Sequence, residues 1–248
     1  MTINTRSDGR TYSEIRPLII TPHYTKYAEG SVLVCCGDTK VICTASVENK
    51  VPDWLLDEQS NPIHGWITAE YGMLPRSTGS RRRRETGMIQ GRTQEIQRLI
   101  GRSLRSTANL HSLGKNTVWI DCDVIQADGG TRTASITGGF VALIYALRKM
   151  FDNEDIKEFP IKEFLAAISV GIVNQQPVLD LNYDEDKNAE VDMNVVMLSS
   201  GKLVEVQGTA EGKTYSRQQL NIMLDLAEQG IRSLIDSQKK VLGNNLAS

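Results

Sequence analysis

The sequence has few of the residues that bind transition metals or form disulfides. Its 248 residues include three histidines and four cysteines, and no two cysteines have the CxxC spacing of a zinc site. The cysteines at 35, 43 and 122 lie in apolar, strand-like runs, where reduced thiols are typically buried. We therefore expect neither zinc chemistry nor a disulfide framework, and reduced cysteines indicate a cytoplasmic protein.

Long hydrophobic runs and an excess of one charge are also missing. No run of about 18 apolar residues occurs, and the N-terminus has no apolar stretch of signal-peptide length, so no membrane segment is expected. The net charge of -2 excludes a uniformly basic nucleic-acid coat. With 40% hydrophobic and 23% charged residues, the chain has an ordinary globular composition and is long enough to bury a large core.

Periodic patterns predict both strands and helices. β-branched runs at 31–36 and 40–47 flank Gly37 and predict a hairpin. A largely apolar run at 134–150 predicts a buried helix, and Ser216 is suited to cap a long C-terminal helix. Other expected elements are a helix at 93–106, strands at 117–126, 165–173, 178–181, 192–199 and 203–207, and a loop at 51–63.

This order of elements predicts an α/β (α+β layered) fold, with mixed β-sheets packed against α-helices, rather than a doubly wound parallel sheet. A single domain over residues 1–248 is expected from the length. A charged stretch that ends in a proline, at 151–160, suggests a loose subdivision into residues 1–150 and 160–248.

Arginines are concentrated in one segment of the chain. Residues 76–105 contain nine arginines and two glutamates, which gives this window a charge of +7 and leaves -9 for the rest. Arginine recognises phosphate by planar, bidentate hydrogen bonding, so an RNA or DNA backbone is a natural partner. The alternatives are a solvated loop or a contact with an acidic neighbour in an oligomer. The arginines are Arg76, Arg81, Arg82, Arg83, Arg84, Arg92, Arg98, Arg102 and Arg105.

A glycine-rich segment, 126–134, follows an expected strand and opens an expected helix. Two glycines allow the backbone to approach a ligand closely, and the free N–H groups of a helix start attract anions. Thr131, Arg132 and Thr133 add further donors. The segment has neither the Walker A nor the GxGxxG pattern. It predicts an anion pocket, and the alternative is a tight turn with an exposed arginine.

Carboxylates are dense between residues 180 and 192. Without nearby histidines they suit a hard cation such as Mg²⁺, bound with waters and a substrate phosphate; the alternative is a solvated acidic loop. Together with the arginines and the glycine-rich segment, they favour phosphoryl or nucleotidyl transfer on a polyanion. The carboxylates are Asp180, Asp184, Glu185, Asp186, Glu190 and Asp192.

At these residues the sequence closely resembles the RNase PH family of phosphorolytic 3′-to-5′ exoribonucleases, from about residue 6 to residue 242. The stretch Cys122–Arg132 is highly specific for this family. Other matching segments are Tyr24–Val32, Gly65–Arg76, Gly91–Leu99 and Asp192–Val196. The resemblance implies the RNase PH-like fold with two pseudo-similar halves. The loop at 53–63 is longer, and the Arg81–Arg84 run more basic, than is usual in the family.

The resemblance also implies a reaction. Inorganic phosphate, the co-substrate, attacks the last phosphodiester of a tRNA precursor and releases a nucleoside 5′-diphosphate. The reverse reaction adds nucleotides, as in a tRNA nucleotidyltransferase, and ribosomal RNA processing is a further implied role. Family members use a divalent metal, Mg²⁺, and self-associate as a homohexameric ring, a trimer of dimers.

The matching positions imply roles for individual residues. Arg92, Gly130, Thr131 and Arg132 correspond to the residues that hold the phosphate. The acidic pair corresponds to Asp186 and Asp192, to which we assign Mg²⁺ binding, with one of them acting as general acid. Together with Arg92 and Arg132 they form the expected catalytic set. The residues expected to grip the RNA acceptor stem are Arg76, Arg81, Arg82, Arg83 and Arg84.

Two other functions fit parts of the sequence. A catalytically silent ring subunit that only binds RNA typically lacks the phosphate arginines or the acidic pair, and both are present here. A small-molecule phosphotransferase leaves the arginine-rich window unexplained and requires a nucleotide-binding loop that the sequence lacks.

Overall fold

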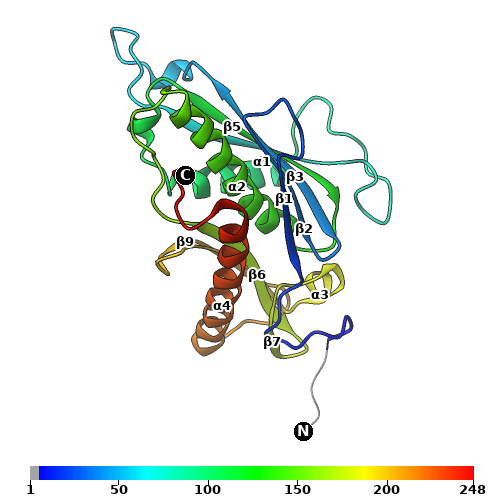
Figure 1. Cartoon of the computed structure of the whole chain (residues 1–248). Coiled ribbons are helices and arrows are strands. Elements are labelled where there is room, and N and C mark those ends of the chain that lie inside the picture. The colour runs from blue at the N-terminus through cyan, green and yellow to red at the C-terminus, as the bar shows by residue number, and fades with distance from the viewer. Residues whose placement is uncertain (1–5) are drawn as a thin grey trace.

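The computed structural model describes residues 6–248, which form two β-sheets and four α-helices (Figure 1). The strands are β1 (Leu18–Pro22), β2 (Gly30–Cys36), β3 (Thr39–Glu48), β4 (Trp66–Met73), β5 (Thr117–Gln126), β6 (Leu165–Val173), β7 (Gln176–Leu179), β8 (Val191–Leu198) and β9 (Leu203–Ala210). The helices are α1 (Gly91–Arg105), α2 (Thr131–Asp152), α3 (Tyr183–Asn188) and α4 (Arg217–Leu242), and the short 3₁₀ helices are η1 (Asp53–Leu55) and η2 (Leu110–Leu113).

The first sheet has the strand order β1-β2-β3-β5-β4. Its strands pair antiparallel, except that β4 lies parallel to β5. The C-terminal ends of β4 and β5 therefore lie side by side. Because β4 leads into the arginine-rich loop and α1, while β5 leads into the glycine-rich segment and α2, the two segments with an unusual sequence begin at the same edge of this sheet.

The second sheet has the order β7-β6-β8-β9 and is antiparallel throughout. Helix α4 packs on it, while α1 and α2 pack on the first sheet, and α2 also contacts β6 (Figure 1). By length and composition α2 could cross a membrane, but 78% of its apolar window is buried within the protein. It is therefore the central core helix that joins the two sheets.

Small residues allow this helix to approach the first sheet closely. A Cβ atom added at Gly30 on β2 would lie 1.9 Å from the backbone oxygen of Ala142, and one added at Gly138 on α2 would lie 2.5 Å from a methyl carbon of Val34. At Gly30 the backbone of β2 thus touches the backbone of α2, and at Gly138 the backbone of α2 touches the side chain of Val34 on β2.

The structure confirms the mixed α/β architecture and most of the expected elements. The hairpin, the strands at 117–126 and 165–173 and the Ser216 cap are present, and Ser216 forms a capping box with Gln219. Helices α1 and α2 begin two and three residues earlier than predicted. The division into residues 1–150 and 160–248 stays a prediction.

Other expectations were wrong. The strand expected at 178–181 is β7 at 176–179. It ends where Asp180 takes a positive φ of 54°, which turns the chain away from the sheet. Strands β1 and β4 and helix α3 were not predicted, and the acidic segment, for which a solvated loop was one alternative, contains α3.

Candidate active site

One cleft of about 620 Å³ collects the expected phosphate-binding and acidic residues. It opens where the N-terminal ends of α1 and α2 meet α3 and the strands β8 and β9. Of the expected phosphate-binding and acidic residues in its lining, two come after residue 160 and four before residue 150, so both parts of the chain contribute to one site. These six residues are Arg92, Gly130, Thr131, Arg132, Asp186 and Asp192.

The glycine-rich segment forms the floor of an anion pocket. Gly129 and Gly130 have φ angles of 72° and 63°, in the left-handed region that glycine favours. Gly130 is the N-cap of the 22-residue helix α2, whose first turn has no side-chain cap. The backbone N–H groups of that turn therefore remain available to an anion, and the helix dipole adds positive potential.

Thr131 is held in place by a neighbour that the sequence did not reveal. Its Oγ1 lies 2.8 Å from the hydroxyl of Tyr71 on β4. Burial raises the pKa of Tyr71, so its hydroxyl keeps its proton and stays available for this hydrogen bond. This hydrogen bond connects the start of α2 to strand β4.

The two expected phosphate arginines occupy equivalent positions, each being the second residue of its helix. Arg132 donates to the side-chain oxygen of Gln207 at 3.2 Å and lies 3.4 Å from Glu95 Oε1, while Gln207 donates to the same glutamate oxygen at 2.8 Å. The side chain of Arg92 makes no hydrogen bond or ion pair within residues 6–248. Its guanidinium is therefore free to meet an anion in the cleft.

Asp186 and Asp192 face these arginines from α3 and β8. Burial raises the pKa of both carboxyls, and their mutual repulsion raises that of Asp192 further, to about 6, although Arg132 and Arg92 act in the opposite direction. Asp192 therefore exchanges a proton near neutral pH. Perturbed carboxyls opposite arginines in a cleft are typical of catalytic sites.

This carboxylate pair fits a magnesium ion. Residues 6–248 contain no group of three or more histidine, cysteine or acidic side chains arranged around a metal, which argues against a closed protein cage. Mg²⁺ is usually bound by one or two carboxylates and completes its shell with water and substrate phosphate. A cation between Asp186 and Asp192 would also offset the repulsion from Asp186 that raises the pKa of Asp192.

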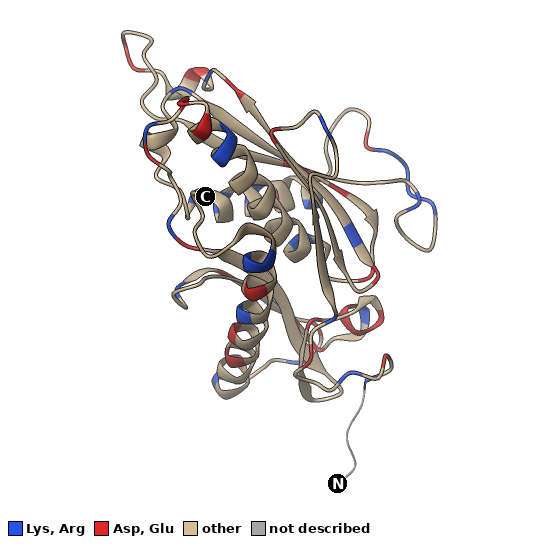
Figure 2. Cartoon of the chain, viewed as in Figure 1, with Lys and Arg blue, Asp and Glu red and all other residues tan. Residues whose placement is uncertain are grey.

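The arginine-rich loop between β4 and α1 extends from the edge of the first sheet at which β4 and β5 end (Figure 2). Arg82 lines the cleft, and with Arg83 and Arg84 it also lines an adjacent pocket of about 280 Å³. Arg76 and Arg81 line neither pocket, and Arg76 donates within its own turn, to the oxygen of Gly79 at 2.6 Å. The structure thus brings three of the five expected RNA-binding arginines beside the residues that we expect to be catalytic.

The remaining acidic candidates do not face the cleft. Asp180 and Glu185 are buried and bind Arg16 and Arg6, and Asp184 is exposed on the outside of α3. Sequence reasoning also missed Glu95, which follows Arg92 by one helical turn. No local signal marked Gln207 or Tyr71, because their roles depend on strands that come together only in the fold.

The chain matches known proteins over most of its length. The 3′ exoribonuclease family matches with its domain 1 at residues 14–148 and its domain 2 at residues 163–230. Ribonuclease PH of Moorella thermoacetica is 58% identical over 241 residues, covering 96% of this chain and 95% of that protein. Ribonuclease PH of Bacillus subtilis (strain 168) is 57% identical over 244 residues, covering 97% and 98%.

Solved structures share the fold at lower identity. A chain of the Archaeoglobus fulgidus exosome with RNA bound to the active site has a TM-score of 0.76 and 23% identity, covering 94% of this chain and 92% of that one. A chain of an archaeal exosome core has a TM-score of 0.72 and 22% identity, covering 96% and 91%. With both family domains matched and relatives above half identity, the chain belongs to the RNase PH group of 3′ exoribonucleases.

Proposed function

We propose that this cleft performs phosphorolysis at the 3′ end of RNA. The chain is a phosphorolytic 3′-to-5′ exoribonuclease that trims 3′ extensions of tRNA precursors, with inorganic phosphate as co-substrate. The observation that carries the assignment of residues is the opposition of Arg92 and Arg132, at two helix starts, to Asp186 and Asp192 across one cleft.

In this reaction an oxygen of inorganic phosphate forms a bond to the terminal phosphorus, and the bond from that phosphorus to the 3′ oxygen breaks. The products are a nucleoside 5′-diphosphate and RNA shortened by one nucleotide. Nucleophile and target are both anions, so the site must neutralise charge and align the two groups. Arg92, Arg132 and the N–H groups after Gly130 supply donors for this purpose. One phosphate linkage replaces another, so the reaction also runs in reverse.

The leaving 3′ oxygen needs a proton. Asp192 is suited to give it, because its carboxyl has a pKa of about 6 and is half-buried in the cleft. Asp186 and the ionised form of Asp192 would hold Mg²⁺, which supplies charge neutralisation at the phosphates when bound.

The arginine-rich loop is proposed to hold the RNA. Arg82, Arg83 and Arg84 lie next to the cleft, with Arg76 and Arg81 on the same loop. Arginines of this kind bind phosphates and position RNA without reading its bases. The relatives named ribonuclease PH, at 57–58% identity, support RNA as the polymer. We extend the proposal to ribosomal RNA, to a cytoplasmic location and to a homohexameric ring.

The decisive experiment uses a tRNA with a labelled 3′ extension, Mg²⁺, and buffers with and without inorganic phosphate. Nucleoside diphosphates that appear only with phosphate establish phosphorolysis. Monophosphates released without phosphate mean hydrolysis and refute the anion-pocket assignment. Tight RNA binding without release favours the silent-subunit function instead.

The arginine assignment has its own test. We expect Arg92→Ala or Arg132→Ala to lower phosphorolysis by roughly 10²-fold or more, as loss of a transition-state donor does. Filter binding should show nearly unchanged affinity for tRNA, because neither residue lies on the arginine-rich loop. Wild-type turnover in the Arg92→Ala protein would remove Arg92 from the mechanism.

A further inference from the structure

Two arginines of the N-terminal segment are buried, and the reaction above gives them no role. Arg6 and Arg16 have exposed fractions of 7% and 5%. A buried guanidinium is costly unless it is fully paired. Both pair with acidic residues more than 160 positions away in the sequence, and those partners lie immediately before or within α3, the helix that carries Asp186.

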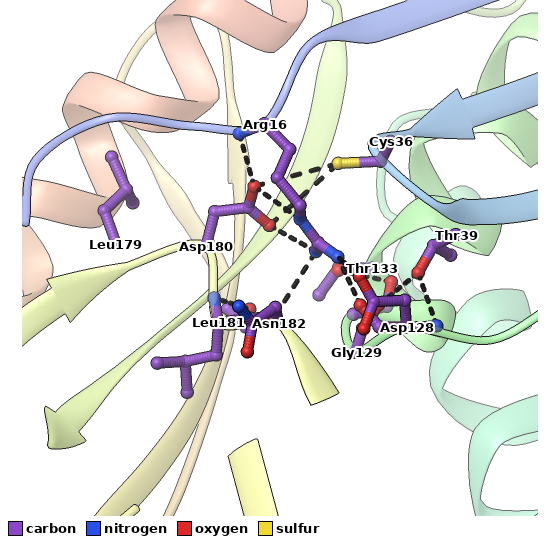
Figure 3. Close-up of polar contacts among 12 residues, drawn as sticks. Arg16, Cys36, Thr39, Asp128, Gly129, Thr133, Leu179, Asp180, Leu181 and Asn182 are labelled. Atoms are coloured by element: carbon purple, nitrogen blue, oxygen red, sulfur yellow. Dashed lines mark hydrogen bonds and ion pairs between the residues drawn. The ribbon is translucent and has the colours of Figure 1, made fainter. Parts of the chain in front are cut away.

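Arg16 and Asp180 form the centre of this network (Figure 3). Arg16 Nε and Nη2 donate to the two carboxylate oxygens at 3.0 and 2.6 Å, and the Arg16 backbone N–H donates to Oδ2 at 2.7 Å. Arg10 Nη1 donates to the same carboxylate at 3.2 Å. Burial alone would lower the pKa of Arg16, but the hydrogen bonds and charge of Asp180 raise it above its ordinary value. The Arg16 guanidinium therefore keeps its charge although it is buried.

The same guanidinium reaches the anion pocket. Arg16 Nη1 donates to the backbone oxygen of Asp128, the residue before the two glycines, and Nη2 donates to the backbone oxygen of Leu181 at 3.3 Å (Figure 3). The carboxylate of Asp128 in turn accepts from the N–H of Tyr183, the first residue of α3, at 3.2 Å. One side chain thus contacts the segment that enters α2 and the segment that enters α3.

Arg6 fixes the next part of α3. Its Nε donates to Glu185 Oε1 at 2.6 Å, and its Nη1 donates to the oxygen of Leu179 at 2.8 Å. Glu185 also completes the capping box of α3, with Asn182. The side chain held by Arg6 is therefore the immediate neighbour of Asp186.

Helix α3 lacks the apolar face that usually anchors a helix. It has six residues, and Glu185 is the buried one among them. An amphipathic helix normally gains its position from apolar side chains in the core, and the buried side chain of α3 is a charged one. The placement of Asp186 relative to Gly130 and Arg132 therefore depends on these ion pairs and hydrogen bonds.

We propose that Arg16 and Asp180 are positioning residues that set the separation between the glycine-rich segment and the carboxylate pair. The inference rests on the proposed phosphorolytic function of the cleft. Neither residue touches the reacting groups, so their effect is on alignment. Displacements near 1 Å can cost about 10²-fold in rate, so an alignment role predicts a large kinetic effect from a buried, indirect residue.

The test compares Arg16→Gln with Arg148→Gln. Arg148 also bridges distant segments, since it donates to the backbone oxygens of Leu246 and Asn245 at 3.0 and 2.9 Å, but it lies on the far end of α2. We expect Arg16→Gln to raise KM for inorganic phosphate and lower kcat, each by roughly tenfold or more, with KM for RNA within about twofold of wild type. Arg148→Gln should lower the melting temperature and leave both KM values unchanged.

Two further variants sharpen the result. Arg16→Lys keeps the charge but loses the bidentate geometry, and it should fall between wild type and Arg16→Gln. Asp180→Asn keeps the shape of the side chain, and it carries the test with the same expectation if Arg16→Gln does not fold. Phosphate binding is also read without turnover, from the rise in melting temperature with phosphate concentration, which Arg16→Gln should weaken.

The outcomes separate the two proposals. A wild-type protein that releases no nucleoside diphosphate in a phosphate-dependent way refutes the proposed function. An active wild type, together with an Arg16→Gln protein whose KM for phosphate is unchanged, refutes the positioning role alone. Equal kinetic losses in Arg16→Gln and Arg148→Gln would also refute the positioning role, because they would show that Arg16 contributes only to the stability of the fold.

Discussion

At the scale of single residues, a side chain that suits the reaction can lower the stability of the folded protein. Asp192 is the clearest case, because its carboxyl is half-buried beside Asp186. A carboxyl whose pKa is raised in the folded state binds protons more tightly folded than unfolded. The folded state is therefore penalised as the pH rises above the ordinary pKa of aspartate, the penalty is complete above the raised pKa, and it is absent below the ordinary value.

This penalty leads to a stability prediction for Asp192→Asn. Between the ordinary pKa near 4 and the folded value of about 6, the cost of Asp192 grows with pH, and above about pH 6 it is fully present. We expect Asp192→Asn to raise the free energy of unfolding by about 3 kcal/mol at pH 8, with little change at pH 4, while phosphorolysis is lost. Urea titrations in EDTA at both pH values measure the difference. Equal effects at the two pH values would contradict the assigned shift.

The sequence predicted these residues unevenly, for a physical reason. The anion pocket is built from consecutive residues between a strand and a helix, so its chemistry is visible in the order of the chain. Arg132, by contrast, is held by Glu95 and Gln207, which lie 37 and 75 positions away. Pairings of that separation exist only after β9 has joined the second sheet, and no local pattern encodes them.

At the scale of elements, the same distinction explains which helices and strands were predicted. Strands β5 and β6 were placed with correct bounds because their apolar side chains fill the core on one or both faces. Helix α3 was not predicted, because helical periodicity is read from buried apolar residues. The buried residue of α3 is Glu185, and the helix has no apolar stripe. Its stability comes from a capping box and from arginines of the N-terminal segment.

The close approach of β2 to α2 yields a prediction about packing. Gly30→Ala places a Cβ 1.9 Å from the backbone oxygen of Ala142, and a backbone atom cannot yield as a flexible side chain can. We expect the free energy of unfolding to fall by about 3 kcal/mol or more, measured by chemical denaturation. Gly79→Ala is the matched control, because nothing lies within 4 Å of its added Cβ. A Gly30→Ala protein as stable as this control would show that α2 does not pack against β2 as described.

The arginine-rich loop yields a prediction about RNA binding. Replacing Arg81–Arg84 by alanine removes four exposed or half-buried cations, of which Arg82, Arg83 and Arg84 line the cleft or the pocket next to it. We expect weaker tRNA binding. The plot of log affinity against log salt concentration should also become flatter, its slope changing by about 0.9 for each duplex phosphate that the loop no longer neutralises. The KM for inorganic phosphate should stay near its wild-type value, since Arg92 and Arg132 remain. An unchanged salt slope would mean that the loop faces a protein neighbour instead of RNA.

At the scale of the whole molecule, the active site exists only because two sheets share one core helix. The residues before 150 supply the anion pocket, and those after 160 supply the acidic pair. The concentration of arginine at 76–105, with +7 in that window and -9 in the rest of the chain, marks the loop and helix that lie beside this cleft. The sequence revealed that both groups of residues were present. Their meeting in one cleft follows from the parallel pairing of β4 with β5 and from the ion pairs at α3, which depend on tertiary structure.

The surface of the whole molecule leads to the last prediction, the homohexamer. Several large apolar side chains are strongly exposed in the single chain, among them Met88 at 93%, Tyr27 at 85% and Trp54 at 64%. Exposed apolar groups of this size are typical of surfaces that partners cover. A ring of six 27.5 kDa chains has a mass of about 165 kDa, and we expect sedimentation equilibrium to give that value. A Tyr27→Ser, Trp54→Ser double variant, which leaves every cleft residue in place, should shift the distribution towards smaller species. A wild-type mass of a single chain would contradict the ring and would leave these side chains to be explained by a different partner.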